Sequence, residues 1–444
     1  MKKIIYLLIG VLLFVGNTRA QQNNTELPDS ATADDCVQYA LKHYPEVQQQ
    51  YINENITKSQ IKTKLADWYP QIDAQGTLQH YFKLPTTIMN TTGQASFVQT
   101  GIRNNTGVSF GLTQNIFNRD ALLAVKTKGT VLQQAEQNIA STKIDVVANV
   151  RKAFYDVLLT RQQIGVLNED IIRLQKSLKD AKSRYNAGIV DNTDYKRAVI
   201  SLNNSIAQVH AQQALLVSKY ATLKQLMGYP SNNELHIHIA DSSFLEREAM
   251  FDTLSTVDPK RRIEYRQLQT EQELNFANLK YQKWSFIPTL SGVAQYNLAY
   301  MSNKNFGDMF KNEFPNSFVG LQLGFPIFQG GKRTENIRIA EMQIDLNKLD
   351  RENLSNAINA EYENALAVYK GDLGTYLTLK ENVELARQVY QTISLQYQAS
   401  YKSYLDVTNA ETDLRAAEIN YANALYQLII DKVDIQKSLG LLQY

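Results

Sequence analysis

RYNAGIVDNTDYKRA, residues 184–198, interrupts a long helical pattern with one glycine, Gly188, and two aspartates, Asp191 and Asp194. A related break, QYQASYKSYLDVTNA, occupies residues 396–410 in the second half of the chain. Glycine accepts backbone angles that are costly for other residues, and aspartate is favoured at helix starts. Each break is therefore predicted to be the turn of a helical hairpin.

The segments on either side of these breaks carry a heptad repeat. Before the breaks, apolar side chains step by three and four through two stretches: Ile164, Leu167, Ile171, Leu174, Leu178, Ala181 and Tyr185, and Tyr376, Leu379, Val383, Ala386, Tyr390, Ile393 and Tyr397. After the second break the same spacing continues: Val407, Ala410, Leu414, Ala417, Tyr421, Ala424 and Leu428. This spacing is typical of helices packed as coiled coils, so these residues are interpreted as core.

Helix lengths constrain the architecture further. The pattern from about 120 to 187 lacks proline over roughly 68 residues, which predicts a helix about 100 Å long. The returning helix, about 193–227, covers half of that length, and a helix at about 33–66 supplies the rest. The second half repeats the set at about 259–286, 332–400 and 405–440.

The chain is an internal repeat. ADWYPQIDAQGTLQHY in the first half resembles KWSFIPTLSGVAQYNLAY in the second, and LKQLMG resembles IQKSLG. Such self-similarity predicts one structural unit present twice. We divide the chain into a first repeat, 21–230, a linker region, 231–258, and a second repeat, 259–444, each repeat with a short helix, two strands, a long helix and a short helix.

Between the first short helix and the long helix of each repeat, the apolar period changes to two. Ile72, Ala74 and Leu78 alternate with polar residues, and Val319, Leu321 and Leu323 do the same in the second repeat. Four strands of about 10 to 12 residues with one apolar face suit a membrane β-barrel. A barrel needs at least about eight strands, so several chains would share one. A soluble sandwich joined to a coiled coil is the alternative.

The segments that join the paired strands, residues 83–105 and 301–316, are polar and are predicted to be extracellular loops.

The first residues have the composition of a secretory signal. MKKIIYLLIGVLLFVGNTRA, residues 1–20, has a basic start, a short apolar run and a small residue, Ala20, at its end. The apolar run is short for a bilayer, which disfavours the alternative of an amino-terminal anchor. The mature chain is predicted to be exported, and its single cysteine, Cys36, excludes an internal disulfide.

Composition narrows the function. The chain has 46 basic and 44 acidic residues, a net charge of +2, which disfavours nucleic-acid binding. We find no nucleophile triad, phosphate loop or metal-ligand cluster in the sequence, so no enzyme activity and no cofactor is expected. His236 and His238 lie on one face of a short predicted strand, where metal binding is the alternative to a solvated face. Asp191 and Asp194 are interpreted as helix caps rather than as an acid–base pair.

Taken in order, the motifs resemble the TolC-like outer-membrane efflux protein family over the mature chain. YPQI and IPTL open strands, QNIF and FPIFQGG close them, RYNAGIVDNTDY joins helices and SLG lies near the carboxyl end. The resemblance implies a membrane β-barrel joined to a long α-helical coiled-coil barrel. It also implies a homotrimer with four strands per protomer in a twelve-stranded barrel.

The function implied by the resemblance is a passive conduit across the periplasm and outer membrane of a Gram-negative bacterium. It would serve tripartite efflux or type I secretion and open at its periplasmic tip when an adaptor and an inner-membrane pump dock. The alternative is the periplasmic adaptor itself, although that class usually has one hairpin and a soluble β part.

The resemblance also assigns the two breaks to a gate at the periplasmic tip. Gly188 and Ser400 are the hairpin turns, although serine stands where the first turn has glycine. Asp406 would form a ring of three carboxylates that attracts cations, while Asn409 stands where the family has a second acid.

The links that close this gate are assigned by resemblance as well. Tyr397 and Lys402 would link the second hairpin to the first or to the neighbouring protomer, with Asp194 as the acceptor. Lys402 stands where arginine is common in the family, so a bidentate contact is lost. Helix capping is the alternative role for Asp194 and for Asp406.

Overall fold

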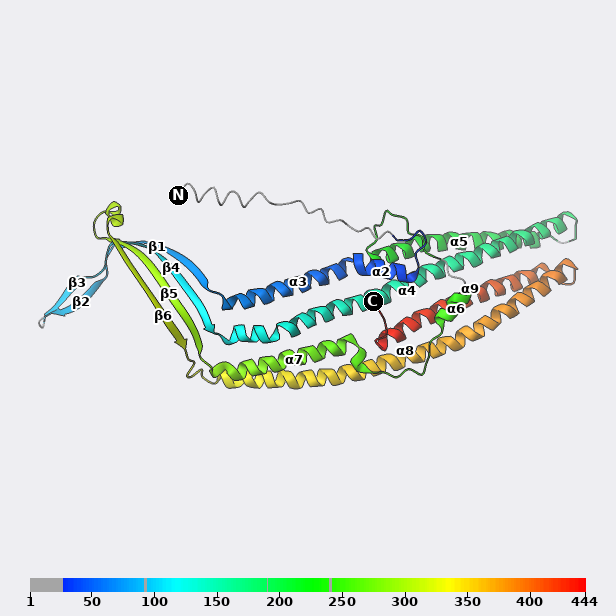
Figure 1. Ribbon diagram of the computed structural model, residues 1–444. Coiled ribbons are helices and arrows are strands. Elements are labelled where there is room, and N and C mark those ends of the chain that lie inside the picture. The colour runs from blue at the N-terminus through cyan, green and yellow to red at the C-terminus, as the bar shows by residue number, and fades with distance from the viewer. Residues whose placement is uncertain (1–26, 92–93, 190, 239–241) are drawn as a thin grey trace.

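The computed structural model describes residues 27–91, 94–189, 191–238 and 242–444, so the predicted signal peptide, residues 1–20, lies outside the described residues. The molecule is elongated, with a sheet at one end and long helices running away from it (Figure 1). The two hairpin turns lie at the end opposite the sheet.

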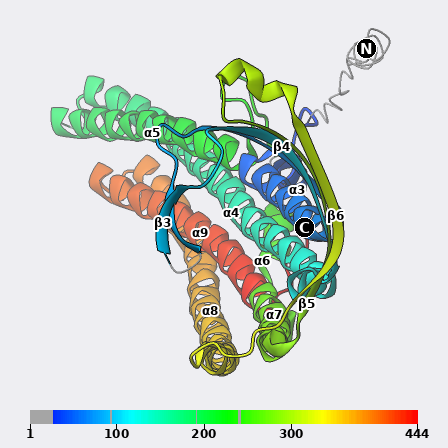
Figure 2. The same ribbon diagram turned by 90° about the vertical axis from the view of Figure 1, so that its left-hand side faces the viewer.

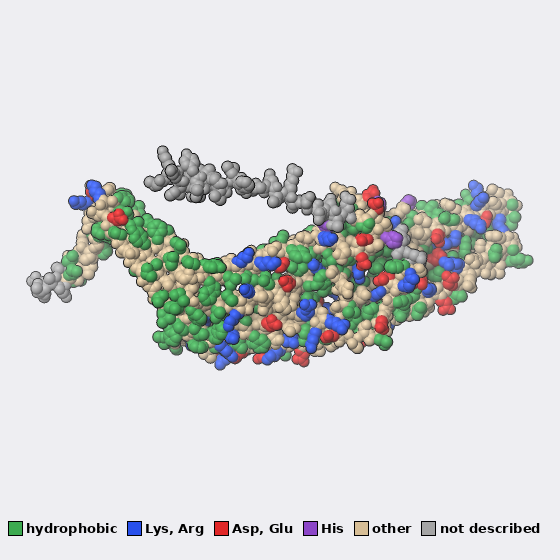
Figure 3. Space-filling view, in the orientation of Figure 1, with side chains coloured by type: hydrophobic (Ala, Val, Ile, Leu, Met, Phe, Trp, Pro, Cys, Tyr) green, Lys and Arg blue, Asp and Glu red, His purple; other side chains and the backbone are tan. Residues whose placement is uncertain are grey.

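The sheet contains strands from both halves of the chain. Its order is β1 (Gln71–His80), β4 (Asn104–Phe117), β5 (Thr289–Ser302) and β6 (Glu313–Gly324), and all neighbours are antiparallel. The register aligns Ile72, Leu112, Ala294 and Val319 across the four strands. The adjacent row is Asp73, Gly111, Gln295 and Phe318. Because side chains alternate between faces, one face is mainly apolar, and hydrophobic side chains gather over this end in Figure 3.

The first loop between strands differs from the prediction. The sequence predicts an extracellular loop without strands at residues 83–105, but β2 (Thr86–Thr91) and β3 (Gln94–Gln99) form a separate antiparallel hairpin within it. The runs around Ile88 and Phe97 are rich in β-branched and aromatic residues, which explains this hairpin. In the second loop, residues 306–311 form the 3₁₀ helix η4 (Phe306–Lys311), whose Met309 is buried.

The helices of the first half surround one long helix. They are α2 (Ala33–His43), α3 (Pro45–Leu65), α4 (Arg119–Asn186) and α5 (Asn192–Met227), with the short turn η1 (Ala66–Trp68) before the sheet. The helix predicted at about 33–66 is broken between α2 and α3. Pro45 cannot continue a helix from the residue before it, and Tyr44 is accordingly extended at φ −65° and ψ 125°.

The second half repeats this order. The turn η2 (Pro259–Arg261) precedes α7 (Ile263–Lys283), and η3 (Trp284–Phe286) leads into the sheet. The long helix is α8 (Lys332–Gln398) and the returning helix is α9 (Tyr404–Ser438), with α6 (Ser242–Ala249) in the segment between the halves. The long helices α4 and α8 contain 68 and 67 residues, close to the predicted length.

The helices form a single curved layer (Figure 2). Near the sheet, α3 contacts α4, α4 contacts α7 and α7 contacts α8; near the turns the order is α5, α4, α9 and α8. The main core lies at mid-length, where the short helices meet, and includes Val147, Phe154, Leu223, Tyr369 and Leu428. A small second core lies at the turns.

Two glycines fix the ends of the returning helices. Gly228 and Gly440 follow α5 and α9 with φ of 66° and 68°. A Cβ atom on Gly228 would lie 2.7 Å from the His43 carbonyl oxygen, and one on Gly440 would lie 3.0 Å from that of Arg261. Glycine therefore satisfies both the left-handed conformation and the close contact with the neighbouring helix.

Within the described residues, none of the helices has the length and hydropathy that a membrane-crossing helix requires.

Candidate functional site at the hairpin tips

The two hairpin turns have the same backbone geometry. After α4, the Gly188 and Ile189 amides donate to the carbonyls of Tyr185 and Arg184, both at 3.0 Å. After α8, the Ser400 amide donates to the Tyr397 carbonyl at 3.0 Å, and the Tyr401 amide donates to the Gln396 carbonyl at 2.8 Å.

The residue at the centre of each turn has a positive φ, 70° for Gly188 and 65° for Ser400. Ser400 is the sole non-glycine residue with positive φ in the described part of the chain. The second turn therefore keeps the geometry of the first at a conformational cost that glycine avoids.

The helices that leave the turns are capped differently. At α5, the Asp191 carboxylate accepts from the Thr193 amide at 2.7 Å, and this hydrogen bond lowers the pKa of Asp191. At α9, Ser403 and Asp406 form a reciprocal capping box, in which each side chain accepts from the backbone amide of the other. Hydrogen bonds from Ser403 lower the pKa of Asp406. The capping alternative for Asp406 is therefore observed within this chain, whereas Asp194 is not the cap of α5.

Asp194 lies near two buried phenol groups. Burial raises the pKa of Tyr397 and raises that of Tyr404 to about 12, and the charge of Asp194 adds a smaller rise to both. Both phenol oxygens are buried without a hydrogen-bond partner in the described structure. Burial followed by the charge of Asp191 raises the pKa of Asp194. The Tyr397 and Tyr404 rings lie 6.0 Å apart in an edge-to-face arrangement, within the electrostatic reach of Asp194.

The predicted links are not formed inside one protomer. Among the described residues, no hydrogen bond or ion pair joins Asp194 to Tyr397 or to Lys402, and Lys402 is exposed. Asn409 is exposed one helical turn after Asp406, so both lie on one side of α9. Links to a neighbouring protomer stay a prediction.

Arg184, which is not among the site residues predicted from the sequence, joins the two hairpins. Its guanidinium donates to the carbonyls of Tyr397 and Gln398, both at 2.9 Å, and to the Ser400 hydroxyl at 3.1 Å. It also lies 4.5 Å from the centre of the Tyr397 ring. A cation at a helix carboxyl end can bind the last carbonyls of the helix and interacts favourably with the helix dipole. Arg184 therefore holds the end of α8 against the end of α4.

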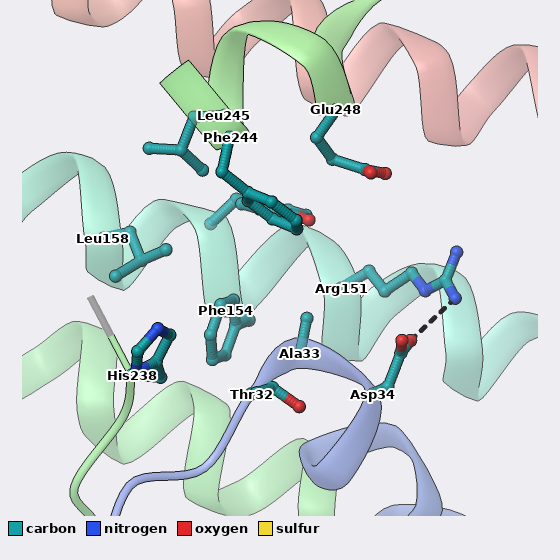
Figure 4. Close-up of a pocket in the computed structure, with 11 residues that line it drawn as sticks. Thr32, Ala33, Asp34, Arg151, Phe154, Leu158, His238, Phe244, Leu245 and Glu248 are labelled. Carbon is teal, nitrogen blue, oxygen red and sulfur yellow. Dashed lines mark hydrogen bonds and ion pairs between the residues drawn. The ribbon is translucent and has the colours of Figure 1, made fainter. Parts of the chain in front are cut away.

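A cavity of about 470 Å³ lies at mid-length, far from the turns. Figure 4 shows Phe154, Phe244 and His238 around it, with Arg151 bound to Asp34 at 2.9 Å on one side. The other predicted histidine, His236, lies 3.6 Å from the Glu234 carboxylate. Within the described ranges, no three metal-ligating side chains come together. We assign no chemistry to this cavity.

Comparisons with known proteins identify the fold and the family. The sequence matches the family described as outer membrane efflux protein over residues 36–229 and 260–441. Two relatives are outer membrane proteins TolC. The one from Vibrio cholerae serotype O1 is 20% identical and covers 76% of each chain. The one from Escherichia coli K12 is 21% identical and covers 77% of this chain and 71% of its own.

Solved structures agree with this fold. The structure of CusC has a TM-score of 0.71 at 16% identity and covers 92% of both chains. The structure of VceC from Vibrio cholerae has a TM-score of 0.70 at 13% identity and covers 92% of this chain and 96% of its own.

Proposed function

Because this chain belongs to the outer membrane efflux protein family and is an efflux channel of the outer membrane, we propose that three copies form one passive conduit gated at the hairpin tips. The adaptor alternative is not supported, since the family match takes in both halves of the chain. The relatives are described as outer membrane proteins, and the proposed role includes no catalytic step.

The observation that supports assembly of several copies is that, in the described part of the chain, both edges of the main sheet lack a neighbouring strand; the number three follows from the family resemblance. Strands β1 and β6 are the outer strands of the sheet, and the edge helices next to them are α3 and α8. Rolling the sheet would place β6 of one copy antiparallel to β1 of the next. Three copies would give twelve strands, enough to close a barrel, whereas four strands are not.

Exposed apolar side chains on the edge helices support contact between neighbouring copies along the helical part of the molecule as well. On α3 and α8 near the sheet they are Ile52, Ile56, Ile339, Met342, Leu346 and Leu349. On α5 and α8 near the turns they are Ile200, Leu215, Leu377, Leu385 and Val389. Contact between α8 of one copy and α3 and α5 of the next would bury both groups. Such head-to-tail contacts close into a ring when the rotation fits.

The gate in this proposal lies at the hairpin tips. Three copies of Asp406 would surround the axis and attract cations, with Asn409 as an uncharged second ring. Tyr397 and Lys402 would bind Asp194 of a neighbouring copy, and Gly188 and Ser400 would form the turns that meet the docking partner. A relative from Pseudomonas putida, TtgC, is described as a probable efflux pump outer membrane protein. By analogy, we propose a periplasmic adaptor and an inner-membrane pump as partners.

Single-channel conductance in a planar bilayer tests the channel and the gate together. The purified trimer would be compared with the double variant Tyr397→Phe, Lys402→Ser in the same salt. We expect a small conductance that rises several-fold in the variant, because each lost link costs about 1 kcal/mol or more of closed-state stability. Equal conductances would remove the assigned links but keep the channel. No conductance from trimers of correct mass would contradict the proposed function.

A further inference from the structure

A cluster of buried charges joins the two hairpins between the mid-length core and the tips. This mid-hairpin charge cluster comprises Asp170, Arg173, Ser205, Glu411, Arg415 and Glu418, from α4, α5 and α9. Asp170 is 0% exposed and Glu411 is 2% exposed. Buried charges are retained only when they are paired or change their protonation state, so the partners of each group decide its role.

Arg415 is the central cation of this cluster. It donates to Asp170 Oδ2 at 3.2 Å and to the Ser205 hydroxyl at 2.9 Å, and Ser205 donates to the same carboxylate oxygen at 2.7 Å. These contacts run from α9 to both helices of the first hairpin. Separation of the second hairpin from α4 would therefore break them.

Arg173 forms the other connection between the hairpins. It lies 3.5 Å from Asp170 Oδ1 and 3.3 Å from Glu418 Oε2. Arg387 of α8 lies 3.5 Å from the second oxygen of Glu418. Asp170 and Glu418 are thus both paired with cations.

Glu411 is the unpaired member. Both of its carboxyl oxygens are buried without a hydrogen-bond partner in the described structure. Burial and then the charge of Asp170 raise the pKa of Glu411 to about 8, and Arg173 and Arg415 oppose this rise. Two phenol groups also face it, Tyr390 from α8 and Tyr404 from α9, while α5 contributes the uncharged Ser205 to the cluster. In this arrangement Glu411 therefore holds its proton more tightly than an exposed glutamate does.

Glu411 is placed on α9 where it can form an ion pair with Arg415. It precedes Arg415 by four residues on α9, and a glutamate four residues before a basic residue is the favoured orientation for a helical ion pair. While the hairpins lie together, Arg415 is occupied by Asp170. If α9 moved away from α4, water would reach Glu411, and its ionised carboxylate would be the nearest acceptor for Arg415 on the same helix.

We propose that Arg415 is a two-position latch, bound to Asp170 while the hairpins are together and to Glu411 when the second hairpin has moved away. The latch rests on the proposed gated channel and adds its regulation. It lowers the cost of opening, because the cation released by Asp170 finds a new partner. Opening releases the proton that Glu411 holds in the closed arrangement.

The proton release fixes the direction of the pH dependence. Glu411 binds its proton more tightly in the closed arrangement, where its pKa is about 8, than in water, where the ordinary value is 4.5. The closed arrangement therefore gains most from this group below pH 4.5 and loses that gain as the pH rises to about 8. The open fraction should rise over this range, by at most about tenfold per pH unit for each chain, and level off above it.

The test is the conductance of the purified trimer between about pH 5 and pH 9 in a planar bilayer. Wild type, Glu411→Gln and Asp413→Asn would be compared, because Asp413 is an exposed carboxylate on the same helix and serves as the matched control. Wild type and Asp413→Asn should open progressively with rising pH. Glu411→Gln should lose most of this dependence and stay mainly closed, because glutamine cannot ionise and offers Arg415 no charge.

A further variant, Asp170→Asn, distinguishes the latch from general destabilisation of the hairpins, because the two substitutions should change the open fraction in opposite directions. Asp170→Asn removes the closed-state partner of Arg415, so it should raise the open fraction at every pH while Glu411→Gln lowers it. Conducting trimers in which wild type and Glu411→Gln share one pH profile would overturn the latch alone. Absence of conductance from every folded trimer would contradict the channel proposal and the latch with it.

Discussion

The two hairpin turns share a backbone geometry but differ in what holds them. The first turn has Gly188 at its left-handed position, and its own Arg184 reaches across to the carbonyls of the second. The second turn has Ser400 at that position and Gln396 where the first has Arg184. The side chain of Arg184 in the first hairpin therefore binds the second turn, and the second hairpin has no equivalent arginine at position 396. We call these hydrogen bonds of Arg184 the tie.

This difference indicates which hairpin can move away from its neighbours at the lower free-energy cost. The first hairpin consists of α4 and α5. Its helix α4 lies in the middle of the layer and contacts α9 of the second hairpin as well as α5. Among the described residues, the tip of the second hairpin is held to the first by the hydrogen bonds of Arg184 and by the small core around Tyr397 and Tyr404. We expect substitutions at the tie to act mainly on the second hairpin.

The largest effect is expected from Arg184→Ala, which removes three hydrogen bonds and the contact with the Tyr397 ring. Hydrogen bonds to charged groups contribute about 1.5–3 kcal/mol each when buried, and less here because the side chain is partly exposed. The open fraction should rise by about tenfold, as measured by single-channel conductance.

Two further variants make this result specific. Arg184→Lys should recover only part of the closed state, because lysine keeps the charge but lacks the planar fork. Lys182→Ala removes an exposed cation from the same helix and should leave conductance unchanged. A similar increase from Lys182→Ala would mean that general charge, rather than the tie, controls the tip.

A smaller effect is expected from the caps. Ser403→Ala removes the reciprocal capping box of α9 and should destabilise the start of this helix by about 1 kcal/mol. Asp191→Ala removes one capping bond of α5 and is expected to cost less. Hydrogen exchange of the first-turn amides would show faster exchange at α9 in the first variant. If the first-turn amides of α5 and α9 exchange at wild-type rates in both variants, packing rather than capping stabilises the first turns of these helices.

The smallest effect is expected from Ser400→Gly. Glycine relieves a left-handed conformation that costs other residues about 1 kcal/mol, but the substitution also loses the hydroxyl that Arg184 binds. The two changes should nearly cancel in the wild-type background. When Ser400→Gly is added to Arg184→Ala, there is no hydrogen bond to the hydroxyl left to lose, and only the backbone strain at residue 400 is relieved. Hydrogen exchange of the amides in the second turn should therefore slow. A double-mutant cycle that shows additivity would contradict the coupling between Ser400 and Arg184.

Some structural features that the sequence-based predictions lack nevertheless have a local signal in the sequence. Pro45 signals the break between α2 and α3, since a proline disfavours helix in the residue before it. Ser403 and Asp406 have the spacing of a capping box, yet Asp406 was assigned only to the pore or to a simple cap. The β2 and β3 runs have strand composition within a segment that its polar residues marked as a loop.

The sequence by itself determined the long helices, the four strands of the main sheet and the positions of the turns. These features follow from periodicity and from local backbone preferences, which neighbouring residues carry. Tertiary structure alone decided the partners of Arg184 and the burial of Glu411. The groups that Arg184 binds belong to residues more than 200 positions away, and two of them are backbone carbonyls that exist in any sequence. Glu411 is buried where α9 packs against α4 and α8, and no local pattern encodes those contacts.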